Sequence, residues 1–252
     1  MTVEQAYGEV ERLTRARARN FAYGIMLLPR PKRRAIAAIY AFARRVDDLA
    51  DGDLPAIEKR RRLEALHDSL QTAPDGEALW VALADARRRY PIPGRALHDL
   101  VDGGLQDLDR QRYADFEELL GYCRRVAGAV GVACTAVYGA DQPQRAEALG
   151  VALQLINIMR DVAEEDIAAG RCTGAWQALM AHQAVRARAY LAEGLTLLSY
   201  LDRRSSACVA TFAGLYRATL DRIERAGYDV FSGPPVLSPL TKLRIVGAGL
   251  IR

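Results

Sequence analysis

The feature that most constrains this 252-residue chain is a helical periodicity that runs almost unbroken from end to end. Apolar residues recur at three- and four-residue spacings, whereas two-residue alternation and Asn-Gly hairpin turns are absent. Clusters of Gly and Pro are frequent enough to end helices, but none has the length or composition of an interdomain linker. We therefore predict a single all-α domain spanning 1–252. The expected helices lie near 3–22, 32–51, 55–73, 76–90, 93–106, 115–139, 143–164, 174–203, 206–226 and 238–250.

Composition narrows the classes of protein that this chain can be. Hydrophobic residues make up 50% and charged residues 26%, which is typical of a globular protein, and the net charge of +4 is too small to favour nucleic acid. The four cysteines form no C-x-x-C pair, there is no signal peptide, and the longest apolar run, 126–140, is shorter than the ~18 residues of a membrane span. We therefore expect a cytoplasmic protein.

Basic residues are concentrated near the N-terminus, and two interpretations of them are open. They could form a solvated helical face, or they could bind phosphate or an anionic membrane surface, in which case the protein would be peripheral to the inner face of the membrane. The residues are Arg12, Arg15, Arg17, Arg19, Arg30, Lys32, Arg33 and Arg34.

The segment 40–51, YAFARRVDDLAD, places several carboxylates on one helical face. At about 100° per residue, Tyr40, Arg44, Asp47 and Asp51 fall within roughly 60° of one another, with Asp48 beside them. Like charges four residues apart destabilise a helix, and the helix dipole disfavours anions at a C-terminus. A hard cation would compensate for both penalties. The alternative is a solvated helix end.

The segment 154–165, QLINIMRDVAEE, repeats this pattern. Gln154, Asn157, Asp161 and Glu165 follow one another at spacings of three and four, so they share a helical face. An Asn within an otherwise apolar helix requires a polar partner. An amphipathic helix with its polar residues turned outward is the alternative, but a second acidic face in the same helical protein favours binding.

Two acidic faces directed at one site fit the ionisation of a diphosphate. Mg²⁺ prefers oxygen ligands and shares them readily with substrate phosphates. Arginine side chains would add permanent positive charge to the site, and an apolar interior would shield an allylic cation from water. We expect Gly128 and Gly131 to leave room for two hydrocarbon chains. The three histidines are scattered and form no zinc-binding pattern.

At these motifs the sequence resembles the squalene/phytoene synthase family. The first segment is similar to that family's D-x-x-x-D motif, and the second to its QLTNILRDVxED motif. The resemblance continues through ARNFAYGIMLLP (17–28), YCRRVAGAVG (122–131), YRATLDRIERAGYDVF (216–231) and KLRI (242–245). It covers nearly the whole chain, and its opening block resembles most the bacterial squalene synthases of hopanoid pathways.

The resemblance implies an isoprenoid-synthase fold with helices packed around a central cavity. It also implies Mg²⁺-dependent, head-to-head condensation of two farnesyl diphosphates through presqualene diphosphate, toward squalene. The implied catalytic residues are Asp47, Asp51, Asp161, Tyr40 and Arg44. The implied magnesium ligands are Asp47, Asp48, Asp51, Asn157, Asp161 and Glu165. The implied substrate-binding residues are Asn20, Phe21, Arg44, Tyr122, Val126, Gly131, Gln154, Arg160 and Tyr216.

The sequence departs from the family pattern in three places. One is Gly233-Pro-Pro after DVF, where relatives usually keep a basic residue. Asn20 stands where many relatives carry Ser before the Phe. After the second motif, the G-R-x-Y-x-P stretch and about twenty residues of loop are missing, so we predict a chain break or a disordered loop between about Glu164 and Gly170. Glu165 lies at the edge of this gap.

Several alternatives stay open. The chain could be a phytoene synthase that joins two geranylgeranyl diphosphates, or a non-catalytic relative that serves as an assembly or binding protein, although such relatives tend to lose the Asp residues kept here. Chain-elongating prenyltransferases favour D-D-x-x-D in both halves, and terpene cyclases would not need the Arg44-type first motif. NADPH could bind without a G-x-G-x-x-G fingerprint, and the sequence specifies neither the final product nor the oligomeric state.

Overall fold

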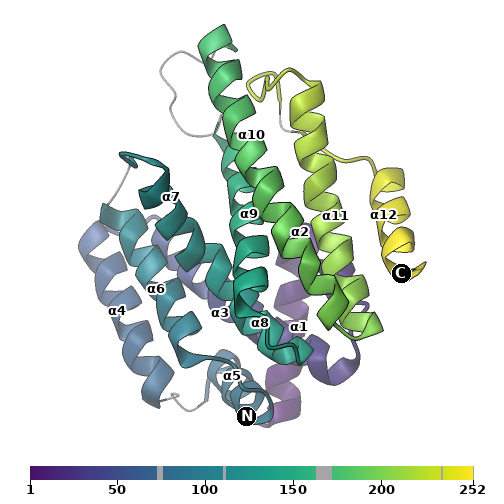
Figure 1. Ribbon diagram of the computed structural model, residues 1–252. Coiled ribbons are helices and arrows are strands. Elements are labelled where there is room, and N and C mark those ends of the chain that lie inside the picture. Colours follow the sequence, from purple (N-terminus) through teal and green to yellow (C-terminus); the bar gives the residue numbers. More distant parts are fainter. Residues whose placement is uncertain (73–75, 110–111, 163–171, 234, 252) are drawn as a thin grey trace.

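The computed structural model describes residues 1–72, 76–109, 112–162, 172–233 and 235–251. Every regular element in these ranges is helical, and none of them is a strand (Figure 1). The first half of the chain holds α1 (Val3–Arg17), α2 (Arg19–Ile25), α3 (Arg30–Asp51), α4 (Ala56–Thr72), α5 (Ala78–Arg89) and α6 (Gly94–Asp109). The second half holds α7 (Phe116–Cys123), the π-helix η1 (Arg124–Gly128), α8 (Ala129–Tyr138), α9 (Pro143–Asp161), α10 (Gly174–Leu195), the 3₁₀-helix η2 (Thr196–Tyr200), α11 (Arg203–Arg225) and α12 (Pro239–Ile251).

Two long helices, α3 and α9, organise the packing. Helix α3 packs against α1, α5, α6 and α8, whereas α9 packs against α8, α10 and α11. Helix α8 lies between α3 and α9, so these two helices face the same interior from different sides. The core is built from fully buried aromatic and aliphatic side chains such as Phe42 and Ile39 on α3 and Leu155 and Ile156 on α9. The predicted all-α fold is confirmed.

The structure differs from the predicted helix boundaries where local geometry overrides periodicity. The expected helix 3–22 is divided at Ala18, whose ψ of 1° ends α1 before α2 begins. The expected helix 115–139 is continuous, but it contains the π-helical turn η1. The expected helix 174–203 stops at Leu195, and Asp202 accepts hydrogen bonds from the backbone N–H groups of Arg204 and Ser205 to begin α11. The predicted break near 164–170 lies outside the described residues.

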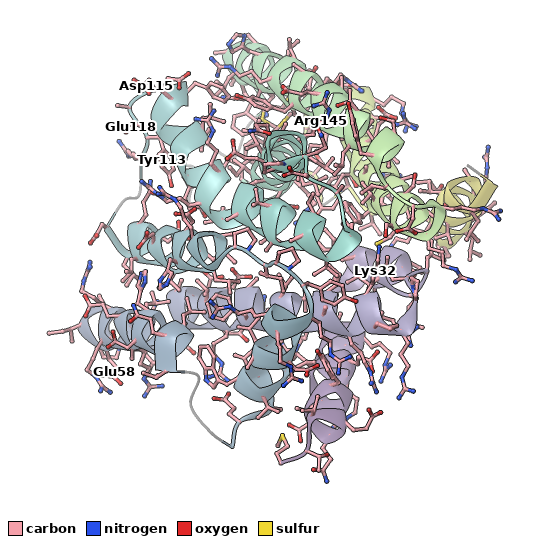
Figure 2. All side chains as sticks on the ribbon, turned by 60° about the horizontal axis from the view of Figure 1, so that its bottom comes forward. Lys32, Glu58, Tyr113, Asp115, Glu118 and Arg145 are labelled. Carbon is pink, nitrogen blue, oxygen red and sulfur yellow. The ribbon has the colours of Figure 1, made fainter. Side chains whose placement is uncertain are left out.

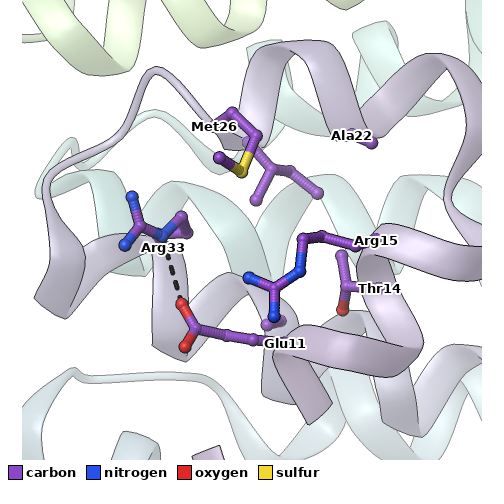
Figure 3. A pocket seen from close by; sticks show the side chains of 8 residues that line it. Glu11, Thr14, Arg15, Ala22, Met26 and Arg33 are labelled. Atoms are coloured by element: carbon purple, nitrogen blue, oxygen red, sulfur yellow. Dashed lines mark hydrogen bonds and ion pairs between the residues drawn. The ribbon is translucent and has the colours of Figure 1, made fainter. Parts of the chain in front are cut away.

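Most of the N-terminal basic residues on α3 are held in ion pairs with neighbouring helices. Arg30 and Arg34 pair with Glu4 of α1, and Arg33 pairs with Glu11 at 3.1 Å. Figure 3 shows that last pair beside a small pocket of only about 10 Å³, which has room for a single water-sized molecule. This part of the basic cluster therefore ties α3 to α1 through ion pairs.

Lys32 makes a second connection, at the junction of α3, α8 and α11 (Figure 2). Its ammonium donates hydrogen bonds to the carbonyl of Tyr138 at 2.6 Å and to the carboxylate of Asp202 at 2.7 Å. A third bond reaches the hydroxyl of Ser205 at 3.2 Å. The Lys32 ammonium thus provides hydrogen bonds both to a carbonyl at the C-terminal end of α8 and to the residue that caps the N-terminus of α11.

Candidate active site

A cavity of about 520 Å³ lies between α2, α3, α6, the α7–η1–α8 segment, α9 and α11. Its walls are mostly aliphatic and aromatic, with residues such as Ile36, Ile39, Leu153 and Val209. Most of its charged lining comes from the ends of α3 and α9, which are the two segments that carry the acidic motifs. The cavity therefore combines an apolar interior with one polar region.

The first motif reaches the cavity from the last three turns of α3. Tyr40, Arg44, Asp47 and Asp51 all line it, as their spacing predicted. Asp48 does not line it: its carboxylate is exposed and pairs with Arg44 across one turn at 2.5 Å. Asp48 therefore lies beside the polar region, where its charge still acts on Asp47.

The protein environment makes the ionised form of Asp47 unfavourable. Desolvation by the surrounding protein is the largest cause, followed by the negative charge of Asp51, and Arg44 compensates only in part. Together they raise the pKa of Asp47 from 3.8 to about 6. Such an accumulation of carboxylates is the environment that a bound cation would relieve.

The second motif reaches the same cavity from the last two turns of α9. Gln154, Asn157, Arg160 and Asp161 line it. Arg160 donates two hydrogen bonds to the carboxylate of Asp161, at 2.6 and 2.5 Å. The Oδ1 atom of Asn157 is buried and has no hydrogen-bond partner among the described residues, which is costly unless a ligand supplies one.

An aromatic group forms the wall between the cavity and α11. Phe21 of α2 lines the cavity and packs against Phe212 and Tyr216 of α11, with ring centroids 5.7 and 5.6 Å apart. Tyr216 is buried behind Phe21 and is not part of the lining. Burial raises the pKa of the Tyr216 phenol, while the charge of Arg160 acts in the opposite direction.

Comparison with known proteins identifies a family whose model matches most of the chain. The squalene/phytoene synthase family model matches residues 14–173 and 162–241. The chain belongs to the squalene/phytoene synthase family. Members of this family are prenyltransferases that bind prenyl diphosphates. The two matched segments overlap at 162–173.

Curated relatives share much of the sequence. The phytoene synthase of Mycobacterium tuberculosis is 40% identical over 277 aligned residues, which cover 98% of this chain and 91% of that protein. The 15-cis-phytoene synthase of Synechococcus elongatus is 33% identical and covers 100% of this chain and 94% of its own length. Both alignments are longer than this chain, so they contain gaps in it.

Solved structures share the fold. A dehydrosqualene synthase superimposes with a TM-score of 0.85 at 23% identity, covering 98% of this chain and 96% of the other. The squalene synthase of Alicyclobacillus acidocaldarius superimposes with a TM-score of 0.82 at 26% identity, covering 90% and 96%. The all-α isoprenoid-synthase fold is thus shared across the family.

The oxygen donors of this family member fit a magnesium site. The cavity offers the carboxylates of Asp47, Asp51 and Asp161 and the unpartnered amide oxygen of Asn157, all hard ligands suited to Mg²⁺. Among the described residues, no three His, Cys, Asp or Glu side chains lie close enough to hold one ion by themselves. Mg²⁺ commonly keeps several waters and is bound through one or two carboxylates together with substrate phosphates.

Two glycines allow helices to pack closely. A Cβ on Gly131 would lie 2.3 Å from the carbonyl oxygen of Ala146 on α9, and a Cβ on Gly128 would lie 2.8 Å from the Glu147 side chain. The absence of these side chains lets α8 and η1 approach α9 closely, and the expectation that they also leave room for substrate chains stays a prediction. Gly131 also lines the cavity, as does Val126.

One carboxylate that lines the cavity, that of Asp107, was not expected from the sequence. Asp107 on α6 lines the cavity and accepts a hydrogen bond of 3.1 Å from the hydroxyl of Tyr122, which was expected in the lining. A signal for it exists, because Leu97, Leu100, Gly104 and Asp107 are spaced three, four and three residues apart. A carboxylate that continues the apolar stripe of an amphipathic helix is the kind of residue that marks a functional surface.

Two further assignments cannot be placed by the structure. The side chain of Asn20 and the whole of Glu165 lie outside the described residues. All the other residues assigned to the site from the sequence either line the cavity or, like Asp48 and Tyr216, contact residues that do.

Proposed function

We propose that this protein joins two prenyl diphosphates head to head in a magnesium-dependent reaction within the 520 Å³ cavity. The observation that carries the proposal is the convergence of both acidic motifs on one polar region of an otherwise apolar cavity. Asp47 and Asp51 enter it from α3, and Asn157 and Asp161 enter it from α9. A binding protein that did no chemistry would have no need of both sets.

The substrate we favour is geranylgeranyl diphosphate, which would make the product phytoene. The support is the 40% identity, across almost the whole chain, to a protein named phytoene synthase. Farnesyl diphosphate, condensed toward squalene, is the second candidate. Its support is the hopanoid-type opening block, 17–28, and the fold shared with a squalene synthase at 26% identity.

In this proposal the carboxylates and the amide of the two motifs hold Mg²⁺, with Asp48 and Glu165 as additional ligands. When bound, Mg²⁺ supplies the positive charge that stabilises the departing diphosphate. Arg44 and Arg160 bind the same diphosphate, for which they exchange their contacts with Asp48 and Asp161. Tyr40 orients it from the same face of α3.

The apolar walls then protect the reaction from water. Ionisation of an allylic diphosphate leaves a carbocation, which water would quench unless the cavity excludes it. The aromatic wall of Phe21 and Phe212 and the aliphatic lining also hold the second substrate beside the first, so that its double bond attacks the cation. The four free cysteines are consistent with activity in a reducing cytoplasm.

Product analysis in competition tests the proposal. The purified protein is supplied with Mg²⁺ and equal amounts of farnesyl and geranylgeranyl diphosphate, with and without NADPH, and the products are identified by mass spectrometry. We expect a forty-carbon head-to-head product that disappears when EDTA is added. A thirty-carbon product would select the second candidate, and a product joined head to tail would overturn the proposed chemistry.

A further inference from the structure

The outer faces of α2 and α12 together carry an uncovered apolar surface. On α12, Leu240, Leu243 and Leu250 follow spacings of three and seven along one side of the helix, and the first two are 69% and 64% exposed. Tyr23 and Met26, at the end of α2, are also exposed, as is Val236 just before α12. We refer to these six residues as the α2–α12 face.

The two parts of this face lie side by side. The ammonium of Lys242 on α12 lies 5.9 Å from the ring centroid of Tyr23 on α2. Both helices pack on α11: Gly24 is tight against the backbone carbonyl of Cys208, and Gly249 is tight against Thr211 one turn farther along. Figure 1 shows α12 at the outer edge of the molecule beside α11, on the side away from α4.

The inner side of α12 packs on α11, and its exposed leucines lie on the other side of the helix. Ile245 fits against Gly214, where a Cβ would come within 2.8 Å of its Cγ2 atom, and Gly249 is buried against α11. Leu240, Leu243 and Leu250 therefore lie on the side of α12 that faces away from α11. Clusters of exposed apolar residues on a rigid support mark interaction surfaces.

The charge of the face identifies its partner. Neither α2 nor α12 contains an Asp or Glu, and the whole stretch 230–252 has none, whereas it contains Lys242 and Arg244 within the row of leucines. On these two helices the exposed apolar side chains are accompanied only by cations. This combination fits the surface of a lipid bilayer, which has a hydrocarbon interior and, where the lipids are anionic, negatively charged headgroups. Long basic side chains reach the headgroups while their stems lie along apolar atoms.

We propose that the α2–α12 face binds the surface of an anionic lipid bilayer, with α12 lying in the plane of the interface. No helix in the described part of the chain is long and apolar enough to cross a membrane, so the contact is interfacial. The site lies directly behind this face, because Phe21 and Ile25 of α2 line the cavity from the inner side of the helix that presents Tyr23 and Met26 outside.

This arrangement holds the cavity wall formed by α2 and α11 against the bilayer. A long-chain prenyl diphosphate is amphiphilic, so under the function proposed above its substrates and product would exchange with the lipid phase at that wall. Lipid binding itself, however, needs only the outer residues, and it is measured without any substrate. Its failure and a failure of the proposed reaction are therefore distinguishable.

Vesicle sedimentation tests the proposal with the full-length protein. The protein is mixed with vesicles of phosphatidylcholine containing about one-third phosphatidylglycerol, or of phosphatidylcholine alone. We expect binding to the anionic vesicles that weakens at high salt, and about tenfold weaker binding for L240S/L243S and for K242E/R244E. The matched controls are I57S/V185S, which removes two exposed apolar residues elsewhere, and R95E on α6, and both should bind as the wild type does.

A second measurement keeps the test decisive if a variant proves unstable. L243W places an indole at the centre of the face, and its fluorescence should shift to the blue and be quenched by brominated lipid when anionic vesicles are added. Equal binding of wild type, L240S/L243S and K242E/R244E would overturn the proposal. So would concentration-dependent dimerisation that L240S/L243S abolishes without any vesicle binding, because the face would then join two copies of this chain.

Discussion

The hydroxyl of Tyr122 on α7 donates a hydrogen bond of 3.1 Å to a carboxylate oxygen of Asp107 on α6, and both residues line the cavity. Burial is the main reason that the pKa of Tyr122 lies far above its usual value, and the negative charge of Asp107 is the second. The same carboxylate contributes to the raised pKa of Asp47 on α3. Asp107 thus connects a phenol of the cavity wall to the first acidic motif.

This relationship predicts coupled effects for the two residues. If Asp107 acts by holding Tyr122, then Tyr122→Phe and Asp107→Asn should each reduce kcat/KM by about tenfold, and the double variant should lose little more. Steady-state kinetics of the three variants measures the coupling. Additive losses would show that Asp107 acts separately, through its charge beside Asp47.

Turnover should depend on one carboxylate from each motif. Asp47→Asn and Asp161→Asn keep the size of the side chain but remove a charge from the magnesium site, so each should lower kcat by at least about a hundredfold while the helical circular dichroism is unchanged. Asp68→Asn, an exposed Asp on α4, is the control. Activity within a few-fold of wild type in either motif variant would contradict the proposed metal site.

The same Asp47 substitution should stabilise the metal-free protein. A carboxyl whose folded pKa of about 6 exceeds its ordinary value of 3.8 penalises folding when ionised, so the penalty grows between those pH values and is complete above them. Because Asp47 is exposed to solvent at the end of α3, we expect Asp47→Asn to gain only on the order of 1 kcal/mol. Urea unfolding in EDTA at pH 8 should show the gain, and at about pH 4 it should vanish.

Close helix packing predicts opposite effects for two glycine substitutions. A Cβ on Gly131 would overlap the backbone of α9 at 2.3 Å, so Gly131→Ala should cost about 1–3 kcal/mol of stability. Gly121, in α7, has nothing within 4 Å of its Cβ position, and Gly121→Ala should be neutral or gain up to about 1 kcal/mol. Thermal unfolding of both variants measures this; equal effects would contradict the packing role of Gly131.

Asp202 should contribute to stability through its charge as well as through its cap. Burial alone would raise its pKa, but the hydrogen bonds from Lys32 and Ser205 outweigh that and hold the pKa of Asp202 far below its usual 3.8. Its contribution is therefore present above about pH 4 and is lost as the pH falls toward the lowered value. Asp202→Ala should cost about 1–2 kcal/mol at pH 7, and Asp202→Asn, which keeps a capping oxygen, should cost less.

Much of the fold and site could be predicted from local patterns. The spacing of Tyr40, Arg44, Asp47 and Asp51 places them on one side of a helix wherever that helix goes, and the spacing of Gln154, Asn157 and Asp161 does the same. The family resemblance then predicted that both sides face one cavity. Boundaries were less predictable, because the break at Ala18 and the π-turn of η1 arise from packing that periodicity does not record.

What the sequence by itself determined is therefore the set of helices and the residues of the two acidic faces, because both follow from spacing along a single helix. It also determined the family, through the resemblance of its motifs. Only the tertiary structure decided the contacts between helices. It brought Asp107 of α6 to Tyr122, turned Asp48 away from the cavity onto Arg44, and placed Gly131 against Ala146 of α9. It also joined Tyr23 to Lys242 across more than two hundred residues of chain. Such pairs depend on how helices cross and how closely their backbones approach, and no pattern within one segment contains that information.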